Sequence, residues 1–439
     1  MFLGQHRVEF PPLLPSTTTD LLTKLQADGW RPTRHDSRNS NGYAEAAVAR
    51  RAGLPVHVAV MGASVANGCG AGGGPFHARC RGGGAASPCS PGLGWPRWMQ
   101  ETLGGPVITT VHAKNAAGAS HFSHCVESRV ARNTSVVVLD LSQTSSPTDL
   151  RALYIAVRRA APWASVLSVV WRPAQQLSHP YEHEHDAHGL GVDVLRVDHA
   201  ARALVATNGS CLLYADAVHP SPEGHRLIGE MVGVYIAYQL AQPGIYRPLT
   251  APGAGLPAAL GWERCFADSL HMPVLGSPGR WRVVDEGRSG VPKPTLLSHG
   301  ADDAISVGPL NANASCGGAR DVFNVDLGYR TSKSWEYGAI MLACAPVPGS
   351  TPGGSCTCSA HRHYWSRQLT PFPLVQTNAR LSADSHFRSA SFNFTVTAYT
   401  SFSMVASPPG TRCALNIRHV ASATGNASVV RIDSLAVSC

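Results

Sequence analysis

The sequence SVVVLDL at residues 135–141 is an almost unbroken, valine-rich apolar run. A run of this kind, without polar alternation, is typical of a strand that is buried on both faces of a parallel sheet. Shorter apolar runs occur at 56–61, 107–111 and 166–171, and a further short strand is predicted at 191–197. A parallel sheet is therefore the predicted core of the first half of the chain.

Between and after these strands, apolar residues recur every third or fourth position. This spacing predicts helices over 150–161, 198–206 and 222–240. Strands that alternate with helices form a parallel sheet covered on both faces, so the predicted fold class of this half is α/β.

The second half has a different pattern. Prolines concentrate in residues 243–261, which we interpret as a linker, and from Trp262 onward strands of period two follow, as at 392–399. An all-β sandwich is therefore predicted over 262–439. The α/β domain is placed at 54–242, and the arginine-rich, aperiodic residues 1–53 are expected to be a loosely structured N-terminal arm.

The composition limits the classes of binding partner that can be expected. The 439 residues include 36 basic and 28 acidic side chains, giving +8 at pH 7. The sequence has no basic stripe and no nucleic-acid-binding motif, so no nucleic-acid partner is expected. It also has no run of about 18 apolar residues, so no membrane span is predicted.

Twelve cysteines, an even number, and five Asn-x-Ser/Thr sequons predict a secreted, disulfide-bonded glycoprotein. Zinc is the weaker alternative, because Cys356-Thr-Cys358 is too tight for a zinc knuckle. Five cysteines precede residue 243 and seven follow Trp262, so full pairing requires at least one bridge between the domains. The first residues, MFLGQHRVEFPPLLP, lack the apolar run of a signal peptide; either the true start lies upstream or the signal has been removed.

Three short segments of the first domain fit one mechanism. Ser64 follows the first strand in Gly62-Ala63-Ser64, where a sharp turn would expose a nucleophilic hydroxyl. An ordinary turn with Ser64 as a helix N-cap is the alternative. Asp216 and His219 are three residues apart on a loop, so the carboxylate can orient the imidazole as a general base for Ser64; a solvated loop pair is the alternative.

The third segment is Lys114-Asn115-Ala116-Ala117-Gly118, after the second strand. Gly118 allows close backbone approach and offers an N–H to an oxyanion. In this order and spacing the three segments resemble the SGNH or GDSL-like hydrolases, and in particular a secreted, cysteine-containing algal branch with a C-terminal β-rich domain. The resemblance covers residues 55–242.

The resemblance implies a three-layer α/β/α, flavodoxin-like domain that needs no cofactor and hydrolyses esters through an acyl-serine intermediate. It assigns Ser64 as nucleophile, His219 as base and Asp216 as its orienting group. The backbone N–H groups of Ser64 and Gly118 are the expected oxyanion donors, with Asn115 near the substrate. Ala63 stands where the family name records Asp.

This chain departs most from the family pattern in the third conserved block. The family places an asparagine, the third oxyanion donor, after the third strand, but this chain has Ser142-Gln143-Thr144-Ser145. Thr144 or Gln143 stands at that position, so the Thr144 hydroxyl or the Gln143 amide is the expected replacement donor. We assign the donor role to Thr144 and place Gln143 at the substrate. Loss of one donor typically costs about 2.7–4 kcal/mol, so a slow hydrolase is expected.

The remaining cluster, His179 to His188, is rich in His, Glu and Asp. It does not satisfy the H-E-x-x-H pattern and has Pro180 at its start, so we predict a mobile loop without a metal. A metal site is the alternative.

The predicted partner is an ester substrate, an acylated carbohydrate, and the protein is expected to be a monomer. The alternative function is a cell-surface glycan-binding protein that has kept the hydrolase scaffold. The missing asparagine favours that alternative, and the Asp216–His219 pair argues against it.

Overall fold

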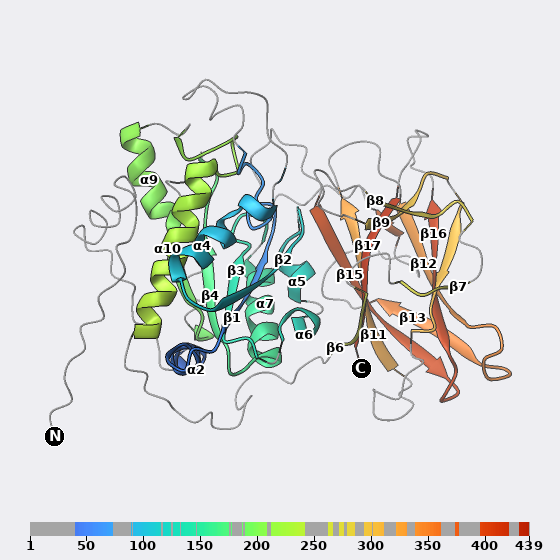
Figure 1. The fold of residues 1–439 in the computed structure, drawn as a ribbon. Helices are drawn as coiled ribbons and strands as arrows, with labels where there is room; N and C mark the ends of the chain where they lie inside the picture. The colour runs from blue at the N-terminus through green and yellow to red at the C-terminus, as the bar shows by residue number, and fades with distance from the viewer. Residues whose placement is uncertain are drawn as a thin grey trace. The chain divides into compact units, whose positions relative to one another are not determined.

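The computed structural model describes residues 40–72, residues 89–241 with gaps of which 178–186 is the longest, and the segments 262–266, 272–310 (with gaps), 322–331, 339–360, 374–376, 396–420 and 430–438. The chain divides into two compact units. The first combines the residues up to Asn115 with Arg129–Gly255, and the second combines Ala116–Ser128 with Leu256–Cys439. Figure 1 shows both units and labels many of their helices and strands.

The first unit is built on a parallel sheet, as predicted. Its strands are β1 (Val56–Gly62), β2 (Val107–Ala113), β3 (Val136–Asp140), β4 (Ser165–Val170) and β5 (Asp193–Arg196), in the order β2-β1-β3-β4-β5. All four neighbouring pairs are parallel. Every residue of β3 and β4 is buried, which explains why these strands have no polar alternation.

Helices cover both faces of this sheet, which confirms the α/β/α layering (Figure 1). One face carries α2 (Ser40–Arg51), α4 (Trp95–Leu103), α9 (Val197–Asn208) and α10 (Pro222–Ala241), which share one buried apolar cluster with β1, β3, β4 and β5. On the other face lies α7 (Pro147–Ala160), whose Tyr154 hydroxyl donates a hydrogen bond of 3.0 Å to Ser168 Oγ of β4. The short helices are α5 (Ala119–Ser123), α6 (Val126–Arg129) and the 3₁₀ turn η2 (Pro91–Leu93).

Helix α2 lies within the segment that we expected to be a loosely structured arm. The Tyr43 N–H donates to Ser165 Oγ at 2.9 Å, and Ala46 is fully buried. Gly42 makes this packing possible, because a Cβ there would lie 2.2 Å from the Ser135 carbonyl oxygen. The sequence SNGYAEAAVARR is dominated by small residues, so its buried face is too weakly apolar to reveal this helix by periodicity. The rest of the arm, residues 1–39, lies outside the described residues.

The second unit is the predicted β-sandwich. One sheet has the order β14-β12-β16-β10-β7 and the other β13-β15-β11-β17-β9-β8, with β6 paired to β17. The strands are β6 (Trp262–Phe266), β7 (Val274–Leu275), β8 (Arg282–Asp285), β9 (Pro294–Ser298), β10 (Ala304–Val307), β11 (Val322–Thr331), β12 (Ala339–Pro346), β13 (Ser355–Ala360), β14 (Leu374–Gln376), β15 (Val396–Ser407), β16 (Cys413–Val420) and β17 (Val430–Ser438). Leu342 and Ile417 of the first sheet share a buried core with Phe323 and Met404 of the second.

Two disulfides tie the sheets of this sandwich together. Cys344–Cys358 joins β12 to β13, and Cys356–Cys413 joins β13 to β16. Both cysteines of the Cys-x-Cys pair are therefore in disulfides, as the non-zinc interpretation expects. The predicted bridge between the domains falls on cysteine side chains outside the described residues and stays a prediction.

None of the helices that the structure describes combines the length and apolarity of a membrane span.

Candidate active site

The turn that carries Ser64 begins where β1 ends. Gly62 is the last residue of β1, and a Cβ there would lie 2.3 Å from Ala66 Cβ, so only glycine permits the tight turn. The turn is closed by backbone hydrogen bonds from the Asn67 N–H to the Ala63 carbonyl (3.2 Å) and from the Cys69 N–H to the Ser64 carbonyl (3.0 Å). Ser64 is thereby held, half-buried, at the carboxyl edge of the sheet, where α/β folds place their ligands.

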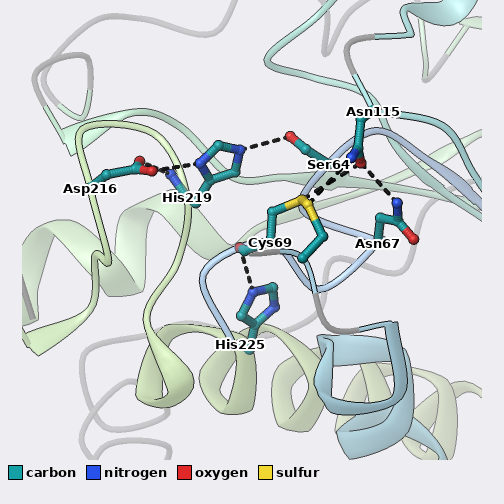
Figure 2. Close-up of a disulfide and its surroundings, with 8 residues drawn as sticks. Ser64, Asn67, Cys69, Asn115, Asp216, His219 and His225 are labelled. Carbon is teal, nitrogen blue, oxygen red and sulfur yellow. Dashed lines mark hydrogen bonds and ion pairs between the residues drawn. A yellow bond between two sulfur atoms is a disulfide. The ribbon is translucent and has the colours of Figure 1, made fainter. Parts of the chain in front are cut away.

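Ser64, His219 and Asp216 form one hydrogen-bonded chain (Figure 2). His219 Nε2 lies 3.0 Å from Ser64 Oγ, and His219 Nδ1 lies 2.7 Å from Asp216 Oδ2. Since an ionised carboxylate only accepts, Nδ1 carries the proton and Nε2 presents its lone pair to the Ser64 hydroxyl. The structure thus brings together three residues that the sequence analysis had selected from two distant segments.

The Asp216 carboxylate is fixed by its own loop. Its Oδ1 accepts hydrogen bonds from the backbone N–H groups of Val218 and His219, both at 2.8 Å. Burial raises the pKa of Asp216, but the hydrogen bonds and charge of His219, together with the Val218 N–H, outweigh it and hold that pKa below its usual value. Asp216 is therefore ionised at neutral pH and able to stabilise an imidazolium at His219.

This loop rests on Trp171, at the end of β4. The Trp171 indole N–H donates to the Val218 carbonyl at 3.4 Å, and its ring lies 4.8 Å from that of Tyr214 between centroids. Tyr214 in turn donates from its hydroxyl to the Arg172 carbonyl at 2.7 Å. The sequence analysis did not select Trp171 or Tyr214, because a buried aromatic after a strand looks like any core residue.

Asn115 lies beside a disulfide next to the Ser64 turn (Figure 2). Its Oδ1 accepts a hydrogen bond from Asn67 Nδ2 at 2.8 Å, and its Nδ2 lies 3.3 Å from Cys89 Sγ. Cys89 is bonded to Cys69, so a disulfide closes the segment 69–89 that follows Ser64. Because both ends of its amide are engaged, Asn115 braces the turn, and its predicted substrate contact stays a prediction.

Two of the predicted oxyanion donors, the Ser64 N–H and Thr144, lie in turns that follow neighbouring strands. No described group accepts a hydrogen bond from the Ser64 N–H, which leaves this donor available. Residues 141–144 leave β3 just after Asp140, which pairs with Gly62, so this turn starts beside the Ser64 turn. There the Thr144 N–H donates to the Leu141 carbonyl at 3.2 Å.

The side chain of Gln143, in the same turn, has its Nε2 buried without a hydrogen-bond partner among the described residues. Gly118 is grouped with the second compact unit. The roles of Gly118, Gln143 and Thr144 therefore stay predictions.

Asp140 is a further ionisable group that the sequence analysis did not select. Its side chain is buried under the Ser64 turn, its Oδ2 accepts a 2.8 Å hydrogen bond from the Trp95 indole, and its carbonyl accepts the Ala63 N–H at 3.3 Å. Burial raises the pKa of Asp140 to about 7, against a smaller lowering effect of the Trp95 bond. A carboxylate at the end of an all-apolar strand was the available signal.

The histidine-rich segment 179–188 lies, except for Ala187, outside the described residues. Elsewhere in the part of the chain that the structure describes, no group of three or more His, Cys, Asp or Glu side chains could hold a metal ion.

The first unit is thus an α/β domain with a Ser-His-Asp relay at the carboxyl edge of its sheet, and the second is a β-sandwich. The structure is similar to that of a solved two-domain esterase (CEX) active on acetylated mannans, with 12% identity and a TM-score of 0.53 over 92% of this chain and 97% of that one. A second structure of a two-domain esterase of this description, co-crystallised with mannopentaose, matches with 11% identity, a TM-score of 0.51 and the same coverage.

A carbohydrate acetylesterase from Sinorhizobium meliloti matches over 42% of this chain and 99% of that one, at 14% identity and a TM-score of 0.30. No protein-family model and no curated protein matches the sequence. The fold that the SGNH resemblance implied is therefore confirmed, and the algal branch stays a prediction.

Gly70 offers a direct test of how the two loops are held. It has φ +92°, and a Cβ there would lie 2.2 Å from the Pro220 carbonyl oxygen and 3.1 Å from His219 Cβ. Gly70→Ala should displace the His219 loop and slow fluorophosphonate labelling of Ser64 by roughly 10- to 100-fold, since small misplacements are costly. The matched control is Gly53→Ala, at φ +71° with nothing within 4 Å, which should label at the wild-type rate. Equal labelling of both variants would contradict the account.

The raised pKa of Asp140 predicts that the stability of the fold depends on pH. In the folded state it stays protonated up to about pH 7, whereas the unfolded carboxyl ionises near 3.8, so wild type loses stability as the pH rises between these values. Asp140→Asn removes this loss. Urea unfolding should show that the free energy of unfolding of Asp140→Asn, relative to wild type, rises by up to about 1.4 kcal/mol per pH unit from pH 4 to 7. Above pH 7 the difference should level off.

The control is Glu101→Gln, whose carboxylate is exposed and paired with Arg97 on α4; it should follow wild type. An Asp140→Asn curve parallel to wild type at every pH would show that Asp140 is not a buried protonated acid.

Proposed function

We propose that the protein is a serine esterase of the SGNH type that hydrolyses acyl esters through an acyl-serine intermediate. The observation that carries this proposal is the continuous relay from Asp216 through His219 to Ser64, with contacts of 2.7 and 3.0 Å. A serine hydroxyl is a weak nucleophile until a base accepts its proton, and this relay supplies both the base and the group that orients it.

In the acylation step, Ser64 Oγ bonds to the ester carbonyl carbon while its proton moves to His219 Nε2. The carbonyl electron pair moves to oxygen, and the resulting oxyanion accepts a hydrogen bond from the Ser64 N–H. When the carbonyl re-forms, the bond to the alcohol oxygen breaks. The alcohol takes the proton from His219 and leaves, and the acyl group stays on Ser64.

In the deacylation step, a water molecule gives a proton to His219 Nε2 and attacks the acyl carbon. The second oxyanion collapses, the bond to Ser64 Oγ breaks, and Oγ recovers the proton from His219 as the carboxylic acid leaves. Asp216 stays ionised throughout, in line with its lowered pKa, and stabilises the transient imidazolium.

For the substrate, we propose short acyl groups, in particular acetyl, carried on carbohydrate. Support comes from the likeness to the esterase active on acetylated mannans, which extends over both units rather than the α/β domain alone. The β-sandwich would then hold the glycan. We further propose that the protein is secreted, supported by its disulfides and by Asn133, a sequon residue whose side chain is exposed.

One feature favours a second candidate, a glycan-binding protein of low activity: the turn Ser142-Gln143-Thr144-Ser145 lacks the asparagine of the family. If Thr144 supplies the missing donor only in part, turnover falls by up to about 10²–10³ and the enzyme is slow. Reaction of Ser64 with a fluorophosphonate separates the two candidates, because only a serine activated by His219 reacts quickly.

Hydrolysis of p-nitrophenyl acetate tests the proposed function. We expect Ser64→Ala to lose all activity above background and Asp216→Asn to lose roughly 10⁴-fold in kcat, since an amide selects the wrong imidazole tautomer. The control Ser355→Ala, at an exposed residue of β13 in the second unit, should keep the wild-type rate. Wild-type protein no faster than Ser64→Ala would overturn the proposal.

A further inference from the structure

His225 is a buried imidazole that the mechanism above does not use. It lies in the first turns of α10, has no exposed surface, and its Nε2 lies 3.0 Å from the Cys69 carbonyl oxygen (Figure 2). A carbonyl oxygen only accepts hydrogen bonds, so Nε2 carries the ring proton and is the hydrogen-bond donor. This bond joins the helix that follows the His219 loop to the end of the turn that carries Ser64.

The segment at Cys69 and Gly70 is where these two parts of the site meet. The Cys69 N–H closes the nucleophile turn on the Ser64 carbonyl at 3.0 Å. The next residue, Gly70, packs so closely on Pro220 and His219 that no side chain fits between them. A shift of the Cys69 carbonyl would therefore move Ser64 and the His219 loop relative to each other.

The start of α10 is itself rigidly attached to the His219 loop. Ser221 precedes the helix and caps it, since its Oγ accepts the Gly224 N–H at 3.1 Å. The Ser221 N–H donates to the Leu213 carbonyl at 2.8 Å, and the Tyr214–Pro220 bridge closes the loop. Through this start of α10, His225 can hold the nucleophile turn at a fixed distance from the base.

A buried histidine at this position lowers the stability of the fold. Burial lowers the pKa of His225 to about 4, so the ring is neutral at pH 7, and Nδ1 has no hydrogen-bond partner among the described residues. An unpartnered buried polar atom costs about 1–3 kcal/mol. A leucine would fill similar space without that cost, so the contribution particular to histidine is the bond to Cys69.

We propose that His225 is a positioning residue, which holds the Cys69 carbonyl against α10 and thereby sets the separation of Ser64 Oγ and His219 Nε2. The proposal rests on the proposed esterase function. It assigns His225 no contact with substrate and no proton transfer.

The test compares His225→Leu with His225→Gln, whose amide N–H can donate to the same carbonyl. His225→Leu should lower kcat for p-nitrophenyl acetate by about 10- to 100-fold, as expected for a displaced nucleophile, with KM nearly unchanged. His225→Gln should recover activity to within about fivefold of wild type, the equivalent of one neutral hydrogen bond. Fluorophosphonate labelling of Ser64 should follow the same order.

Ile228→Ala is the matched control, because Ile228 is fully buried on the same helix, its aliphatic side chain makes no hydrogen bond, and its truncation costs about 2–5 kcal/mol. It should lower the melting temperature and leave kcat unchanged below the transition. Loss of kcat in His225→Leu that Gln does not restore, or His225→Leu behaving like Ile228→Ala, would overturn the positioning role. Wild type inactive toward the ester and unlabelled by the probe would instead overturn the proposed function.

Discussion

The hydrogen bond between His219 Nε2 and Ser64 Oγ is the contact on which the rest of the site depends, and it joins residues 155 positions apart in the chain. Two loops must therefore end at the same edge of the sheet with an accuracy of a few tenths of an ångström. The parallel sheet supplies the common edge, since β1 delivers Ser64 and the end of β4 supports the loop that carries His219. The fold meets this demand with polar groups buried beneath both loops.

These buried and half-buried polar groups hold the two loops in place, and they also cost stability. Asp140 stays protonated up to about pH 7 under the Ser64 turn, and Asn67 and Asn115 pair beside the Cys69–Cys89 disulfide. One ring nitrogen of His225 has no hydrogen-bond partner among the described residues. Each is less favourable than an apolar residue of similar size unless its hydrogen bond does something that packing cannot. Packing cannot supply directional hydrogen bonds such as those of Asp140 with the Trp95 indole, of Asn67 with Asn115, and of His225 with the Cys69 carbonyl.

The strands of the first unit, its helices α7, α9 and α10, the sandwich and the relay residues could be predicted from the sequence, because each leaves a local signal. The valine-rich strand 136–140 and the spacing of Asp216 and His219 are such signals. Helix α2 was missed because its buried face is mostly alanine and glycine, and Trp171 and Asp140 because only the tertiary structure separates their roles from ordinary core packing. The third oxyanion donor could not be predicted, because its identity depends on which side chain after β3 points toward Ser64. Residue types alone give little information about that direction.

The central claim, that His219 activates Ser64 for covalent catalysis, is tested most directly by trapping the intermediate. Wild-type protein mixed with p-nitrophenyl acetate and quenched in acid should carry an acetyl group on the peptide that contains Ser64, detected by mass spectrometry. His219→Ala should show none above the chemical background. An acetyl group on another residue, or equal acetylation of Ser64 without His219, would contradict the account.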